Sequence, residues 1–128
     1  MAFNSGSGST VVTGNVNTAM SPIMPKTEQA LVFEYTAGNG SWQTVYTVPA
    51  NKILYVYCLF ASSSANFNVA WNIDGAGGTE ITDIFGAGNT SVILSTGIPL
   101  AKLIATETLQ MTGTAGARTF FYGVVVDA

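Results

Sequence analysis

From Ala30 to the C-terminus the sequence repeats one local pattern, in which short runs rich in Val, Ile, Thr, Tyr and Phe are separated by Gly, Asn, Pro and Asp. The first set of residues favours strands and the second favours turns. No segment has the periodicity of a helix, so we expect an all-β chain that forms a sandwich or a barrel. The predicted strands lie near residues 30–36, 42–48, 52–61, 67–73, 79–85, 91–96, 99–104, 107–112 and 118–126.

The first 29 residues do not follow this pattern. Ser, Gly, Thr and Asn dominate them, and no strand or helix periodicity runs through them. They are either a disordered tail or an extended arm that becomes ordered along a neighbouring subunit. The division is then an arm over 1–29 and a single β-sandwich domain over 30–128. The apolar residues of the arm are candidates for contact with a capsid or a neighbour: Val11, Val12, Ile23 and Met24.

Two predicted strands have no polar face. In the strand that contains Ile53 to Phe60, strict alternation places Tyr55, Tyr57 and Leu59 on one face, with Cys58 on the other. A strand that is apolar on both faces needs a second packing partner, which is either another layer of the chain or another subunit. The apolar surroundings of Cys58 predict a buried thiol with a raised pKa.

The closing strand from Phe120 to Val126 shows the same absence of alternation. We therefore expect the working unit to be a homo-oligomer whose subunits bury one face of these two strands against each other. The candidate interface residues are Tyr55, Tyr57, Leu59, Phe120, Tyr122 and Val124.

Composition argues against several classes of function. Charged residues make up 9% of the 128 residues, the net charge is −3 and only four residues are basic, so no basic surface is available for nucleic acid. Histidine is absent and Cys58 is the single cysteine, which argues against a Ser-His-Asp triad and a thiolate metal site. We expect no catalytic residue, no metal and no cofactor.

Membrane and export signals are also lacking in the sequence as given. The longest apolar run, Ile53 to Ala61, is less than half of the about 20 residues that a membrane-spanning helix needs. The first ten residues, MAFNSGSGST, do not resemble a secretory signal. We expect no membrane partner, and synthesis in a host cytoplasm.

Three weaker hypotheses stay open. Asp74, Glu80 and Asp83 surround a glycine-rich loop and could bind calcium, although the EF-hand spacing is absent. A pair of carboxylates could act on a sugar as in a glycosidase. The aromatic residues could form a platform for sugar stacking, with Trp71 as the best candidate.

The segment Thr47-Val48-Pro49-Ala50-Asn51-Lys52, followed by an apolar strand, a strand that ends at Ile73-Asp74-Gly75 and the closing strand Phe120 to Val126, resembles small jelly-roll proteins of tailed-phage virions. These include capsid decoration or cement proteins and the heads of short fibres. The resemblance implies a jelly-roll sandwich and a trimer, with no catalytic residues. Asn51 stands where the family commonly has glycine, and Asn also tolerates left-handed backbone angles.

From these observations and the resemblance we expect a non-enzymatic structural protein on the capsid surface of a virion. It binds the viral major capsid protein and stabilises the shell as a homotrimer. The alternative is a trimeric fibre head that binds a receptor or a glycan.

Overall fold

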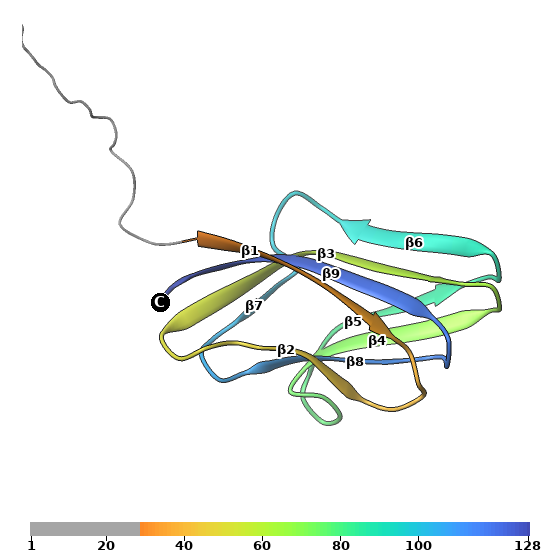
Figure 1. The fold of residues 1–128 in the computed structure, drawn as a ribbon, viewed down its shortest axis with the longest axis horizontal. Coiled ribbons are helices and arrows are strands. Elements are labelled where there is room, and N and C mark those ends of the chain that lie inside the picture. Colours follow the sequence, from red (N-terminus) through yellow and green to blue (C-terminus); the bar gives the residue numbers. More distant parts are fainter. Residues whose placement is uncertain (1–28) are drawn as a thin grey trace, which may run out of the picture.

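The structure, a computed structural model, describes residues 29–128 as nine antiparallel strands in two packed sheets (Figure 1). All nine predicted strands are confirmed, with boundaries that differ by at most two residues. No helix that could cross a bilayer occurs in this part of the chain. The strands are β1 (Gln29–Ala37), β2 (Gln43–Thr47), β3 (Lys52–Ser63), β4 (Phe67–Ile73), β5 (Thr79–Gly86), β6 (Thr90–Ser95), β7 (Ala101–Leu103), β8 (Thr108–Gly113) and β9 (Arg118–Asp127).

The strand order confirms the jelly-roll sandwich. One sheet has the order β1-β9-β3-β6, with the short β7 paired to β3 beside β6, and the other has the order β2-β8-β4-β5. The first strand thus pairs with the last, the second with the eighth, the third with the sixth and the fourth with the fifth. Such nested pairing corresponds to one long hairpin rolled into two sheets, which is the jelly-roll arrangement.

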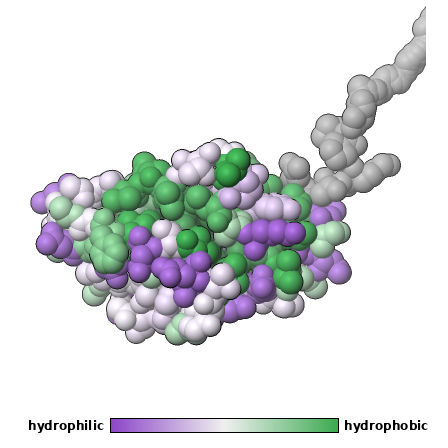
Figure 2. Space-filling model, turned by 180° about the vertical axis from the view of Figure 1, so that it is seen from behind, coloured by the Kyte–Doolittle hydropathy of each residue, from purple (hydrophilic) through white to green (hydrophobic). Residues whose placement is uncertain are grey.

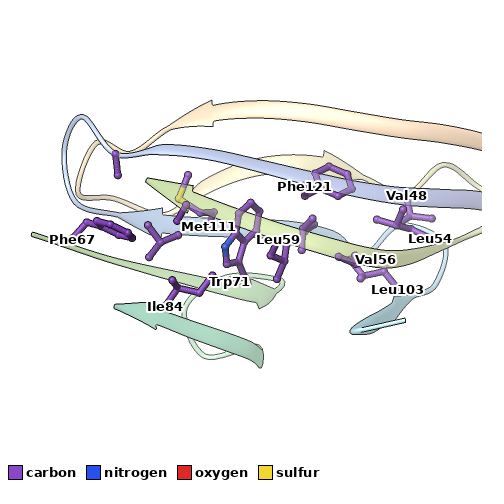
Figure 3. Close-up of a cluster of buried hydrophobic side chains, with 14 of the residues drawn as sticks. Val48, Leu54, Val56, Leu59, Phe67, Trp71, Ile84, Leu103, Met111 and Phe121 are labelled. Atoms are coloured by element: carbon purple, nitrogen blue, oxygen red, sulfur yellow. The ribbon is translucent and has the colours of Figure 1, made fainter. Parts of the chain in front are cut away.

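The core lies between the two sheets (Figure 3). Leu54, Val56 and Phe121 reach it from the five-stranded sheet, and Trp71 and Met111 reach it from the four-stranded sheet. All five side chains are fully or almost fully buried, so one face of each sheet is committed to this core.

The turn chemistry of the sequence is also confirmed. Asn51, Asp74 and Asn89 have φ angles of 62°, 62° and 61°, in the left-handed region that Asn and Asp tolerate better than most residues. Asn51 lies in the turn between β2 and β3. The Asp74 carboxylate accepts hydrogen bonds from the backbone N–H of Thr108 at 2.8 Å and from its hydroxyl at 3.1 Å, which joins the turn after β4 to β8.

Candidate functional site

The outer face of the five-stranded sheet is built by alternation along β9. Thr119, Phe121, Gly123 and Val125 point into the sandwich and are buried, so the residues between them point outwards. These are Phe120, Tyr122, Val124 and Val126, and all four are half-buried in the isolated subunit.

A β-bulge decides which residues of β3 share that face. Val56 pairs with Gly123, but the next pair is Cys58 with Tyr122, so Tyr57 is an extra residue in β3. Strict alternation therefore fails at this point: Leu59 points into the core, where its exposed fraction is 0%, and Phe60 points outwards. The expectation that Leu59 shares a face with Tyr55 and Tyr57 is wrong, because it assumed strict alternation along β3, and the bulge at Tyr57 interrupts that alternation.

The edge strands complete the face. Leu31, Phe33 and Tyr35 of β1 are 72%, 64% and 52% exposed, and Ile93 of β6 is 64% exposed. In the strand register, Phe33 lies opposite Tyr122 and Ile93 lies opposite Phe60. We name this surface the aromatic face. Its residues are Leu31, Phe33, Tyr35, Ile53, Tyr55, Tyr57, Cys58, Phe60, Ile93, Phe120, Tyr122, Val124 and Val126.

Phe120 is the centre of a ring cluster on the aromatic face. Its ring centroid lies 5.2 Å from that of Phe33, 5.1 Å from that of Tyr35 and 5.4 Å from that of Phe60. Centroid distances in this range are those of favourable tilted aromatic pairs. Figure 2 shows hydrophobic side chains gathered along the upper side of the molecule, where Figure 1 places β3 and β6.

Charges lie only around the aromatic face and not within it. In the strand register, Lys102 of β7 lies opposite Tyr55 at one edge of the sheet, and Arg118 of β9 lies opposite Ser62 at one end of it. At the opposite end the Lys52 ammonium forms an ion pair with the Asp127 carboxylate. An apolar centre within a charged border is typical of a protein interface.

Two hollows indent the aromatic face. One has a volume of about 250 Å³ and lies among the rings of Phe33, Phe60 and Phe120. The other, which we name the tyrosine groove, has a volume of about 490 Å³ and is open to solvent. Its lining consists of Tyr55, Tyr57, Cys58, Ser95, Gly97, Tyr122, Val124 and Val126.

Cys58 lines both hollows and is half-buried. The expectation of a buried Cys58 on the face opposite Tyr55 and Tyr57 is therefore wrong, and the bulge at Tyr57 is again the reason. Desolvation raises the pKa of the Cys58 thiol above its ordinary value, as expected from the sequence.

The outer face of the four-stranded sheet differs in character. Thr108, Gln110 and Thr112 of β8 point outwards, as does Asn68 of β4, and Thr44 of β2 is exposed beside Gln110. This is the ordinary polar surface of a sandwich. Phe85 of β5, opposite Asn68 and 71% exposed, is an apolar exception on this otherwise polar face, whereas the aromatic face has no charged side chain.

The other sequence candidates have structural roles. Trp71 is 0% exposed and lies in the core, so it cannot be a sugar platform; its indole N–H has no hydrogen-bond partner there. Asp74 is bonded to Thr108, and Asp83 accepts a hydrogen bond from the Asn68 amide at 3.4 Å. Over residues 29–128, no three acidic or other metal-ligating side chains are grouped around one point.

Of the candidate interface residues, the structure brings together Tyr55, Tyr57, Phe120, Tyr122 and Val124 on the aromatic face. The candidate arm residues lie outside the described part of the chain: Val11, Val12, Ile23 and Met24.

Sequence reasoning missed Leu31, Phe33 and Tyr35 as members of the site. Their signal is a period of two, with Val32 and Glu34 in between. That pattern shows that the three side chains share a face, but it normally places such a face against the core. Only the neighbouring strand β9 determines that this face points outwards.

No protein-family model and no curated protein matches the chain. Among solved structures, the chain is similar to one from Bacillus endospore appendages, which form a family of disulfide-linked pili. The TM-score is 0.52 at 16% sequence identity, and the match covers 93% of this chain and 98% of the pilus chain. A chain of the virus-like particle of the Macrobrachium rosenbergii extra small virus has a TM-score of 0.45 at 12% identity, covering 94% and 96%. A chain of infectious bursal disease virus has a TM-score of 0.41 at 11% identity, and the match covers 93% of this chain and 39% of the viral chain. The pilus similarity shows a shared fold.

Proposed function

We propose that the chain is a non-enzymatic structural protein of a virion, which associates with copies of itself through the aromatic face and reinforces a capsid shell as a decoration or cement protein. The observation that carries this proposal is the aromatic face itself. Its thirteen side chains include no charged one, yet in an isolated subunit they face water. Apolar surfaces of this kind on soluble proteins mark interaction sites.

The size of the aromatic face supports a second copy as its occupant. Four strands about 4.8 Å apart, with about seven residues each at about 3.3 Å per residue, have a projected area of roughly 400 Å². A standard interface buries about 800 Å² per partner. The aromatic face is thus large enough to form a substantial part of such an interface, and the ring cluster around Phe120 would be its centre.

The trimer, the capsid surface and the partnership with a major capsid protein follow from the resemblance to tailed-phage decoration proteins. The fold supports them to the extent that a jelly roll is a common architecture of shell proteins. The arm over residues 1–29 is part of the proposal as a contact with the capsid or a neighbour.

The test is cosedimentation of the purified full chain with empty shells of the proposed capsid partner. We expect saturation at a fixed ratio of chains to shell subunits. Thr44→Glu on the polar sheet face is a control that should bind as the natural chain does, because Thr44 is exposed and away from the aromatic face. Absence of binding to shells together with a monomeric mass would refute the proposal.

The alternative function is a fibre head that binds a receptor or a glycan. One observation favours it: a hollow of about 360 Å³ at one end of the sandwich carries hydroxyl and amide groups and one cation. Its lining includes Ser62, Ser63, Ser64, Asn89, Thr90, Ser91 and Arg118. A fibre head should bind host cells or a glycan array without any shell, and Arg118→Ala should weaken that binding.

A further inference from the structure

We propose that the tyrosine groove binds the segment Pro22-Ile23-Met24-Pro25 of a second copy of this chain. The inference rests on the proposed self-association and deepens it, because it assigns a partner to one part of the aromatic face. It also narrows the role of Ile23 and Met24 from capsid or neighbour contact to neighbour contact.

The chemistry of the groove favours an extended, proline-containing peptide. The lining tyrosines Tyr55, Tyr57 and Tyr122 combine ring surface with hydroxyl groups, and Val124 and Val126 add apolar lining. Grooves lined by aromatic residues bind segments of the form Pro-x-x-Pro, because such segments are already extended before binding and lose little conformational entropy. A groove of about 490 Å³ is within the range that holds a compact ligand.

The sequence before β1 contains one segment of that form, Pro22-Ile23-Met24-Pro25. Proline fixes its own φ angle and disfavours the helical region for the residue before it, so Pro25 favours an extended Met24. Ile23 and Met24 provide apolar side chains between the two prolines. None of the four residues is charged, which matches a groove without charged lining residues.

The position at which the described chain begins favours the groove of a second copy over the chain's own groove. Gln29 pairs with Val126, which pairs with Ile53, so β1 enters the sheet at the end from which the groove extends inwards. A segment before Gln29 would have to reverse direction and then cross two strand spacings, or about 10 Å, to reach Tyr55. Such a reversal would require a tight turn formed by the four residues from Lys26 to Gln29. The groove of a second copy has no such restriction.

Disulfide trapping in the full chain tests this inference, because Cys58 lines the groove and is the single cysteine. Variants Ile23→Cys and Met24→Cys each place a second thiol in the segment. With diamide as the oxidant, we expect at least one of them to form a covalent dimer or a closed covalent trimer on a non-reducing gel, because each chain then gives one thiol to a neighbour and receives one from a neighbour. Thr13→Cys is the matched control in the same arm, and Met24→Cys with Cys58→Ser removes the thiol of the groove.

The outcomes separate this inference from the proposed function. Covalent dimers or trimers that depend on both cysteines support the exchange of segments. A monomer band with both thiols consumed would mean that the segment binds its own groove, and a pattern like that of Thr13→Cys would mean that it does not bind the groove. Either result overturns the inference even if light scattering shows that the chains associate.

An uncrosslinked measurement gives a second readout. The double variant Pro22→Ser/Pro25→Ser should raise the dissociation constant of self-association at least tenfold, because the segment loses its restricted backbone. Asn15→Ser/Asn17→Ser, in the same arm, should leave the dissociation constant unchanged. Equal dissociation constants for the two double variants would overturn the inference.

Discussion

Cys58 lies opposite Tyr122 across the β3–β9 pair only because Tyr57 is an extra residue in β3. Without this bulge, Cys58 would point into the core and Leu59 would point outwards. The bulge therefore places Phe60, and not Leu59, against Phe120 in the ring cluster. One inserted residue thus determines the composition of the aromatic face.

Truncation of two adjacent residues should separate stability from association. Leu59→Ala removes a side chain that is fully buried, and it should lower the free energy of unfolding by about 2–5 kcal/mol. Phe60→Ala acts on the outer face, so it should cost the isolated subunit less stability and weaken self-association more. Urea unfolding followed by tryptophan fluorescence, to which Trp42 and the buried Trp71 both contribute, measures the first effect, and sedimentation velocity measures the second. Similar effects of the two variants on both quantities would contradict the assignment of their faces.

Gly123→Ala should destabilise the sandwich at the bulge. A Cβ atom on Gly123 would lie 2.8 Å from the Leu54 Cδ1 atom and 2.8 Å from the Tyr55 carbonyl oxygen, which is closer than real Cβ contacts. Because one of these atoms belongs to the backbone, β9 would have to move away from β3, at a cost of about 1–3 kcal/mol. Thermal unfolding should show a lower midpoint for Gly123→Ala than for the exposed control Gly40→Ala. Gly40 has a φ angle of 83°, so this control carries backbone strain but no clash.

The Cys58 thiol should react slowly with a thiol reagent at neutral pH and faster as the pH rises. Burial disfavours the thiolate and raises the pKa of Cys58, so the reactive form is scarce until the pH exceeds the ordinary pKa of a cysteine. The contribution of Cys58 to the free energy of unfolding is fully present below the pKa of this thiol in the unfolded chain. It is lost as the pH rises through the higher pKa of the same thiol in the folded chain. Labelling rates between pH 7 and 10 should show a midpoint above that of the urea-unfolded chain. An equal or lower midpoint would contradict the desolvation of this side chain.

The number and approximate bounds of the strands could be predicted because turn residues separate β-rich runs throughout 30–128. The bulge could not, because a bulge is a relation between two paired strands and Tyr57 has nothing unusual in its own sequence context. For that reason, alternation in the sequence places Leu59 in the correct strand but on the outer face, whereas the structure has it in the core.

The candidate site was predictable only in part, for a related reason. Two strands without polar alternation indicate that a second partner exists, and five of the six candidate residues do share one outer face. Leu31 and Phe33 belong to an alternating strand, and alternation alone cannot tell an inner from an outer apolar face. The pairing of β1 with β9 is a contact between the two ends of the described chain, and no local pattern reports it.

The central claim is that the aromatic face binds a second copy of the chain, and multi-angle light scattering of Tyr122→Glu beside Thr44→Glu tests it most directly. At tens of micromolar, the natural chain and Thr44→Glu should have a mass that is a multiple of 13.3 kDa, and three times that mass for the proposed trimer. Tyr122→Glu should keep a strand-dominated circular dichroism spectrum and have the mass of one chain, because a carboxylate on the aromatic face would be buried without a partner. A mass of 13.3 kDa for the natural chain, or an unchanged oligomer for folded Tyr122→Glu, would contradict the claim.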